Sequence, residues 1–306
     1  MNILETLKFF RTQKKIKQKD MLPNHTPGAY RNIEIGKTNL TVANLINFCN
    51  KLNITLVEFF LNVDDLDTEN YRINQTEKQL KKCCNDPTFE LGKQKLLNDY
   101  YWLTNKKDKS IRELNTYLNI KVAFYDTWKE VSPINSQDIE LIKDLLFKQS
   151  IYTHYDYYMF ANTLLYLDEE TINILMKKLF PVTDPNKRSY QTMYMAYSVF
   201  PNLATKYLYA RNYKKARYYV NRGKLQVIKI DYVYINLHLN YLEYTLNYLE
   251  TSKKSDYNKV IKIIEAFETV YGKQMANAFK EEFSDLITSK VPLNLNQITK
   301  ILYTNQ

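Results

Sequence analysis

Glycine is the residue whose scarcity most restricts the fold of this chain. Five glycines occur in 306 residues, whereas an average protein contains about 7% glycine. Sheet-rich folds use glycine in hairpin turns, and phosphate-binding loops need it where the backbone approaches a ligand. The scarcity therefore predicts an all-α protein, and the scattered positions exclude the glycine-rich motifs of nucleotide-binding folds.

Length and composition are those of a globular protein with one or two domains. Hydrophobic residues make up 45% of the chain, which excludes wholesale disorder. Cys49, Cys83 and Cys84 do not make a disulfide framework, which indicates a reducing compartment. The N-terminal apolar run contains Glu5 and Lys8, unlike a signal peptide, and no uncharged stretch is apolar enough to span a membrane. We expect a cytoplasmic protein that does not use a membrane as a partner.

The segment KQKDMLPNHTPGAYRNIEIG has the spacing of two short helices joined by a tight turn. The first helix opens at Gln18. After the turn, Thr26 stands at an N-cap position and Pro27 at the first helical position. The second helix is expected to end at Ile35, followed by Gly36 as a residue that can adopt a positive φ. This pattern predicts a helix-turn-helix, in which the second helix enters the major groove of DNA.

The residues on either side of this segment complete a five-helix domain. The first helix places Ile3, Leu7 and Phe10 on one face. Thr41 and Thr55 are expected to cap the fourth and fifth helices. The apolar residues of those two helices recur at helical spacing and are expected to face inward: Leu45, Phe48, Cys49, Leu52, Leu56, Phe59 and Phe60.

A run of acidic residues marks the end of this domain. Residues 64–69 include three aspartates and one glutamate, and they interrupt the apolar pattern. We therefore expect a helix-turn-helix domain over residues 1–63, a linker over residues 64–73 and a helical domain over residues 74–306.

The remainder of the chain alternates helical segments with short polar loops. Short loops make neighbouring helices antiparallel, and a series of such pairs stacks into an α-solenoid. The segment from Ala204 to Lys224 has the small and aromatic spacing of a tetratricopeptide repeat. Because no clean period of about 34 residues runs along the chain, the repeat is degenerate. The expected helices span residues 77–84, 88–104, 110–119, 122–129, 137–149, 156–166, 169–180, 188–200, 203–210, 214–229, 232–250, 256–270, 273–289 and 294–303.

The N-terminal residues resemble the Cro/C1 (XRE-like) helix-turn-helix group. The shared pattern is an arginine at the end of the first helix, a glutamine seven residues later and a closing aromatic-x-x-Ile-Glu-x-Gly. Its residues here are Arg11, Gln18, Tyr30, Ile33, Glu34 and Gly36. With the helical repeats that follow, the whole chain is similar to the Rgg/MutR family of transcriptional regulators. The segment from His154 to Phe180 looks like that family's central segment, with Phe160-Ala161-Asn162 where Phe-Gly-Asn is usual.

This resemblance implies a homodimer that binds double-stranded promoter DNA. Many members respond to a short signalling peptide, which binds in the concave face of the repeat domain. The resemblance also implies a structural ion pair between Arg11 and Glu34, which would join the first helix to the helix that reads DNA. The effector and the dimer interface are accordingly expected within residues 74–306.

The residues that the resemblance assigns to the DNA surface are Gln18, Thr26, Pro27, Gly28, Tyr30, Arg31, Asn32, Lys37 and Thr38. Pro27 and Gly28 have no side-chain hydrogen-bonding group, so direct readout of bases is expected from Arg31 and Asn32. Gln18 is expected to contact a phosphate. Four nearby lysines, Lys14, Lys15, Lys17 and Lys19, belong to a chain of net charge +10 and are either further phosphate contacts or a solvated basic face.

The peptide-binding hypothesis depends on two weaker features. Residues 187–229 contain ten Lys or Arg and no acid, so this stretch either meets the carboxylate of a peptide or is simply solvated. Two asparagines lie four residues apart and can hold an extended backbone, because an amide both donates and accepts, although paired asparagines are also common in this composition. The expected peptide-binding residues are Asn162, Arg211, Arg217, Asn236 and Asn240.

Catalysis is not expected from this sequence. His25, His154 and His238 lie far apart and have no partner at metal-ligand spacing, so we expect neither a metal nor another cofactor. The leading hypothesis is a DNA-binding regulator controlled by a peptide. The alternatives are a DNA-binding regulator without a diffusible effector and a helical-repeat scaffold that binds other proteins.

Overall fold

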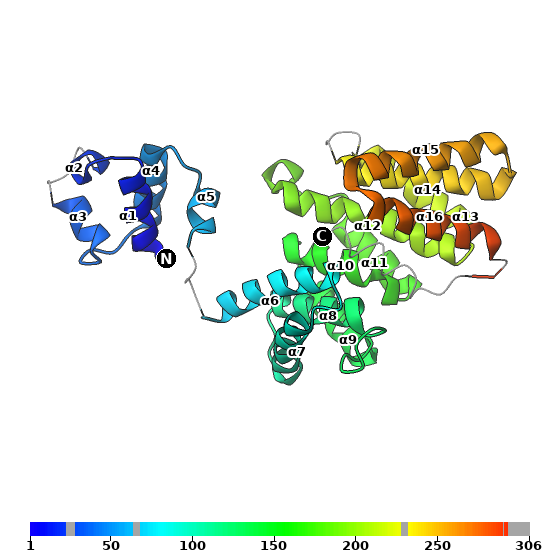
Figure 1. Ribbon diagram of the computed structural model, residues 1–306, viewed down its shortest axis with the longest axis horizontal. Helices are drawn as coiled ribbons and strands as arrows, with labels where there is room; N and C mark the ends of the chain where they lie inside the picture. The colour runs from blue at the N-terminus through cyan, green and yellow to red at the C-terminus, as the bar shows by residue number, and fades with distance from the viewer. Residues whose placement is uncertain (23–27, 64–67, 228–231, 290, 293–306) are drawn as a thin grey trace. The chain divides into compact units, whose positions relative to one another are not determined.

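The computed structural model describes residues 1–22, 28–63, 68–227, 232–289 and 291–292 (Figure 1). Within these ranges the chain forms sixteen α-helices and two short 3₁₀-helices, and it contains no strand. The all-α fold predicted from the scarcity of glycine is confirmed. None of the described helices combines the length and the hydropathy that a membrane span requires.

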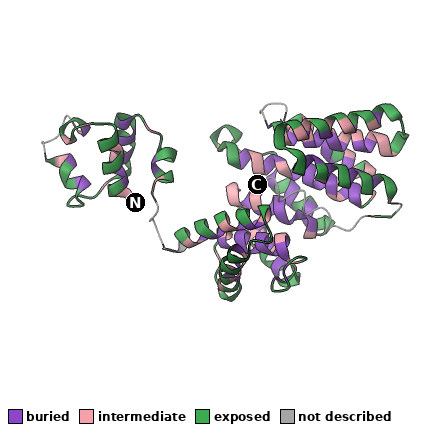
Figure 2. Cartoon of the chain, in the orientation of Figure 1, coloured by how far each residue is buried: buried purple, intermediate pink, exposed green. Residues whose placement is uncertain are grey.

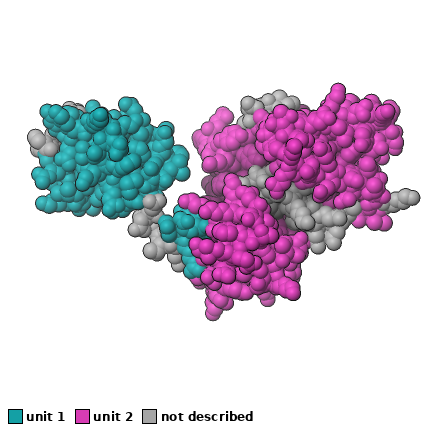
Figure 3. Space-filling view, in the orientation of Figure 1, with its two compact units in different colours: residues 1–77 teal, residues 78–306 magenta. Residues whose placement is uncertain are grey.

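The chain divides into two compact units, residues 1–77 and residues 78–306 (Figure 3). The helices of the first unit before the predicted linker are α1 (Ile3–Gln13), α2 (Gln18–Met21), α3 (Ala29–Glu34), α4 (Val42–Leu52) and α5 (Leu56–Leu61). The two predicted threonine caps are present. Thr41 Oγ1 accepts the backbone N–H of Asn44 at 3.2 Å, and Thr55 Oγ1 accepts that of Glu58 at 3.1 Å.

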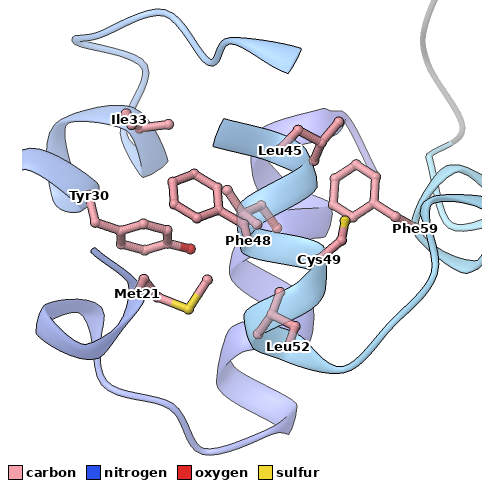
Figure 4. Packing of buried hydrophobic residues seen from close by; sticks show 9 residues of the cluster. Met21, Tyr30, Ile33, Leu45, Phe48, Cys49, Leu52 and Phe59 are labelled. Atoms are coloured by element: carbon pink, nitrogen blue, oxygen red, sulfur yellow. The ribbon is translucent and has the colours of Figure 1, made fainter. Parts of the chain in front are cut away.

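The core of the helix-turn-helix unit is built around α4 (Figure 4). The ring of Tyr30 on α3 packs edge-on against Phe48 on α4, with ring centroids 5.0 Å apart. Leu52 on α4 and Phe59 on α5 are fully buried beside them. Since each large apolar side chain contributes about 1.5–3 kcal/mol on burial, this cluster fixes how α3 is presented.

The predicted linker over residues 64–73 is too long. Helix α6 (Thr68–Asn85) begins inside it and crosses the boundary between the two units. Ile73, Leu80 and Cys83 are buried at helical spacing, which explains why the segment is helical. The acidic residues that suggested a linker immediately precede this helix or lie in its first turn, where negative charge stabilises a helix.

The second unit is a series of packed helices. They are α7 (Glu90–Asn105), α8 (Ile111–Phe124), α9 (Ser136–Lys148), α10 (His154–Thr163), α11 (Glu169–Leu179), α12 (Tyr190–Tyr209), α13 (Tyr213–Val227), α14 (Val233–Thr251), α15 (Lys254–Tyr271) and α16 (Lys273–Thr288), with 3₁₀-helices at Leu164–Tyr166 and Pro185–Lys187. Helices α12 and α13 pack together, as do α14 and α15, while α8, α10, α12 and α14 form a second line of contacts. This arrangement is that of a tetratricopeptide-like solenoid, and α8 and α12 are buried along most of their length (Figure 2).

Two predicted helix breaks are wrong. Residues 110–119 and 122–129 were expected as separate helices, but α8 continues without interruption to Phe124. Helix α12 likewise continues through Pro201, where a break was expected. An internal proline costs about 3 kcal/mol, but Phe200, Leu203 and the proline itself are buried among neighbouring helices. Tertiary packing therefore overrides the local signal.

The helix predicted over residues 294–303 lies outside the described residues.

A buried carboxylate lies where α12, α14 and α16 meet. Glu282 on α16 is almost fully buried, and its Oε1 accepts a 2.8 Å hydrogen bond from the hydroxyl of Tyr209 on α12. Burial raises the pKa of Glu282 to about 7. The buried phenol of Tyr241 on α14 lies beside the same carboxylate, and that carboxylate adds to the rise in the tyrosine's pKa that burial causes.

Glu282→Gln is predicted to stabilise the protein at alkaline pH. The folded-state pKa of Glu282 is about 7, above the value of about 4.3 for an unfolded-state glutamate. The folded state therefore holds the proton more tightly, and the free energy of unfolding falls as pH rises from about 4 to about 7. Glutamine keeps the acceptor for Tyr209 without a charge to desolvate. Thermal melts at about pH 5 and pH 8.5 should show a much larger gain in Tm for the variant at the higher pH. An equal difference at both pH values would contradict the prediction.

Candidate functional site

The carboxylate of Glu34, at the end of α3, joins three helices of the N-terminal unit. Its side chain is only 2% exposed, and Arg11 on α1 donates to it from Nη2 at 2.9 Å and from Nε at 3.3 Å. These contacts raise the pKa of the Arg11 guanidinium above its ordinary value. Gln18 on α2 donates from Nε2 at 2.7 Å. The ion pair that the sequence resemblance implied is therefore present, together with a third partner that the sequence did not indicate.

The hydrogen bond to Glu34 limits how the side chain of Gln18 can contact DNA. Because a carboxylate only accepts, the amide nitrogen of Gln18 must face Glu34. One N–H and the carbonyl oxygen of the amide remain for other partners. The side chain of Gln18 therefore has a structural role, and its remaining N–H can still donate to a phosphate.

Helix α3 has a buried face and an exposed face. Tyr30, Ile33 and Glu34 are buried, as the spacing i, i+3, i+4 requires. The assignment of Tyr30 to the DNA surface is therefore wrong: its ring is 1% exposed and belongs to the core. Arg31 and Asn32 lie on the exposed face.

Helix α3 ends at Glu34, one residue before the expected Ile35, and Gly36 has the positive φ that the sequence predicted. Gly36 has a φ of 76°, in the left-handed region that glycine adopts without strain. The backbone N–H groups of Lys37 and Thr38 donate to the carbonyl of Asn32 at 2.8 and 3.1 Å. The side chains of Lys37 and Thr38 are both exposed.

The start of α3 is later than expected. The predicted helix began at Pro27, whereas α3 begins at Ala29 and Gly28 is its exposed N-cap residue. The expected N-cap Thr26 and the expected first helical residue Pro27 both lie outside the described residues.

Three of the ten cations in residues 187–229 pair with acids from other helices. Lys215 pairs with Glu169 of α11. On α14, Glu243 pairs with Lys224, and Glu250 pairs with Arg217 at 2.7 Å. The sequence could not show this compensation, because the acids lie outside the stretch.

Three of the five expected peptide-binding residues are engaged within the protein. Arg211 donates to the carbonyls of Leu286 at 2.8 Å and Ser289 at 2.7 Å, so it caps the end of α16. Arg217 is held by the ion pair just described. Asn162 is buried, and its Nδ2 donates to Asn119 Oδ1 at 3.1 Å. These three side chains therefore have structural roles, and their contact with a peptide stays a prediction.

Asn236 and Asn240 remain available. They lie one turn apart on α14, and both are half-buried. Within the described residues, neither side-chain amide makes a hydrogen bond. They are the two expected residues whose geometry suits contact with an extended backbone.

The histidine and cysteine on helices α14 and α4 are core residues. His238 is buried, and burial lowers its pKa to about 3, so the ring is neutral. Cys49 is also buried, and burial raises its pKa. No three His, Cys, Asp or Glu side chains converge as metal ligands in the part of the chain that is described.

Comparison with known proteins places this geometry in a family. The model of the family "HTH-type transcriptional regulator Rgg, C-terminal domain" matches residues 94–281. A search of the curated proteins found no match.

Solved structures share the fold at low sequence identity. The PrgX/cCF10 complex matches with a TM-score of 0.75 and 20% identity, over 95% of this chain and 94% of that chain. The structure of a bacterial peptide pheromone/receptor complex matches with a TM-score of 0.74 and 20% identity, over 94% and 99%. The SHP pheromone receptor Rgg2 of Streptococcus dysgalactiae matches with a TM-score of 0.72 and 15% identity, over 92% and 99%. Since the family model covers more than half of the sequence, the chain belongs to the Rgg family of helix-turn-helix transcriptional regulators.

Proposed function

We propose that this regulator recognises its promoter by placing α3 in the major groove of DNA. The observation that carries the proposal is the exposed face of α3. Arg31 and Asn32 lie there with no hydrogen bond or ion pair from their side chains among the described residues, while Glu34 anchors the opposite face. A guanidinium and an amide held in this way are free to meet base edges.

The chemistry of these side chains sets the expected contacts. Arginine pairs bidentately with guanine and asparagine with adenine. Ile35, which is also exposed, offers an apolar contact to a thymine methyl group. Lys37 and Thr38 supply phosphate contacts at the end of α3, and these set register without reading sequence.

Arg31→Ala is predicted to remove base discrimination, whereas Lys37→Ala weakens binding to every sequence. A bidentate arginine contributes about 1–3 kcal/mol of discrimination, so the ratio of specific to non-specific affinity should fall about 5- to 150-fold. Lys37→Ala should leave that ratio unchanged and reduce the salt slope by about one.

Fluorescence anisotropy with the DNA upstream of the gene and with a shuffled duplex measures both effects. Lys51→Ala, an exposed change on α4, is the matched control and should bind as the wild type does. An unchanged ratio in Arg31→Ala would remove α3 as the element that reads the promoter.

We further propose that a short peptide controls the protein through the repeat unit. Two of the structures that share this fold are, by their descriptions, a PrgX/cCF10 complex and a peptide pheromone/receptor complex. The unpaired amides of Asn236 and Asn240 supply donors and acceptors at the spacing of one helical turn. They are suited to bind the backbone of an extended peptide.

The double variant Asn236→Ala/Asn240→Ala is predicted to weaken peptide binding about 10- to 100-fold, the loss of two hydrogen bonds of about 1 kcal/mol each or more. Calorimetry on the full chain measures this, with the synthetic product of a small reading frame beside the gene as ligand. Arg217→Gln is the control, because Arg217 is already paired with Glu250. Equal affinity in all three proteins would exclude α14 as the peptide-binding helix.

We also propose that the protein acts as a homodimer. Operators read by helix-turn-helix proteins are commonly two half-sites bound by a symmetric pair. In addition to the interface expected within residues 74–306, the N-terminal unit carries exposed apolar side chains that a second copy would cover: Val42 and Ile46 on α4, and Val57 and Leu61 on α5.

Val57→Glu/Leu61→Glu is predicted to shift the protein towards monomer. These side chains are 68% and 77% exposed, so the change should not unfold the unit, while a charge at a dimer contact costs several kcal/mol. Sedimentation velocity over a concentration series gives the dissociation constant. A wild-type-like dimer in the variant would show that α5 does not form part of the interface.

The two alternatives predict different results in the same experiments. A regulator without a diffusible effector would retain promoter binding and show no heat with the peptide. A protein-binding scaffold would show no preference for promoter DNA over the shuffled duplex.

A further inference from the structure

A pocket of about 450 Å³, open to solvent, lies between α11 and α13, and no residue of the proposed DNA or peptide sites lines it. Its wall on α11 includes Asn173 and Lys177, one turn apart. Its wall on α13 includes Tyr218 and Arg222, also one turn apart. The volume lies within the range of about 300–1,000 Å³ typical of small-molecule sites.

The interior of the pocket is aromatic. The ring of Tyr207 on α12 stacks on that of Tyr219, with centroids 5.5 Å apart and planes 5° from parallel. Tyr218 packs edge-on against Tyr219 at 5.0 Å, yet remains 55% exposed. The pocket therefore combines a fixed pair of rings with a third ring that a ligand can still cover.

The lining of the pocket contains one ion pair and two cations that no described carboxylate neutralises. Lys215 pairs with Glu169, which cancels the charge of both. Lys177 has no ion-pair or hydrogen-bond partner within the described residues. Arg222 contacts the hydroxyl of Tyr218 at 3.4 Å and lies 5.8 Å from the ring of Phe200, but no described carboxylate neutralises it.

We propose that this pocket binds a small organic anion with a flat aromatic ring. The ring would lie against Tyr218, and the anionic group would be held by Lys177 and Arg222. The free amide of Asn173, which makes no hydrogen bond within the described residues, would donate to the same group. An anion relieves the repulsion between two like charges that face one pocket, and an aromatic body covers ring surface that is now exposed to water.

The site is separate from the proposed peptide-binding residues. Asn236 and Asn240 lie on α14, which contributes no side chain to this pocket. A variant that cannot bind the anion therefore keeps the residues proposed to contact the peptide and DNA. The anion site and the peptide site can each be disproved without the other.

Titration with three probes of one shape tests the chemistry: 2-naphthoate, 2-naphthyl phosphate and neutral 2-naphthamide. Calorimetry on the full-length wild-type protein should show one saturable site for at least one of the two anions. Binding of both defines a general anion site, while binding of one identifies carboxylate or phosphate as the preferred group. Binding of the amide as tightly as the anions, or of none of the three, would overturn the proposal.

Variants on the two walls locate the site. Lys177→Gln/Arg222→Gln should lower the affinity for the bound anion by about tenfold or more, since hydrogen bonds to charged groups are about twice as strong as neutral ones. Tyr218→Ser should also lower this affinity, because the aromatic ring that the ligand covers is lost. Lys214→Gln, an exposed change on the same helix outside the pocket, is the matched control. Unchanged affinity in the double variant and in Tyr218→Ser, with unaltered melting temperatures, would place any binding elsewhere.

Discussion

The buried carboxylate of Glu34 is the contact on which the geometry of the DNA-binding unit depends. An ionised group with 2% of its side chain exposed is stable only when its charge is paired and its oxygens are hydrogen-bonded. Arg11 supplies the charge and Gln18 a further donor, and the two belong to different helices. The orientation of α3 is thus tied to α1 and α2 at the end of the helix, while Tyr30 ties it to α4.

This anchoring separates the two faces of a helix of six residues. All the inward positions serve the core or the ion pair, so the outward positions are free of structural duties. The side chains of Arg31 and Asn32 are exposed and make no hydrogen bond or ion pair among the described residues, so they are available for the DNA contacts proposed above. The same logic explains why Tyr30 belongs to the core although it lies beside Arg31.

In the repeat unit, several ion pairs join neighbouring helices. Helix α13 is basic, and the flanking α11 and α14 supply the acids that pair with it. Cations that are paired in this way, or that cap a helix end as Arg211 does, hold helices together. Lys177 and Arg222, which pair with no carboxylate among the described residues, line the pocket between α11 and α13. Which cations are paired within the protein and which are left to the proposed ligand follows from the packing of the helices.

The sequence by itself determined the features that depend on neighbouring residues. The scarcity of glycine indicated helices, Thr41 and Thr55 marked caps three residues from their partners, and Gly36 marked the end of α3. The resemblance to the helix-turn-helix group predicted the ion pair between Arg11 and Glu34. Only the tertiary structure decided that α12 continues through Pro201, that α6 begins at Thr68, and that Arg211 binds carbonyls 75 and 78 residues away. The reason is physical: caps and turns are satisfied within one helical turn, whereas the partner of a buried or charged side chain depends on which helices pack together.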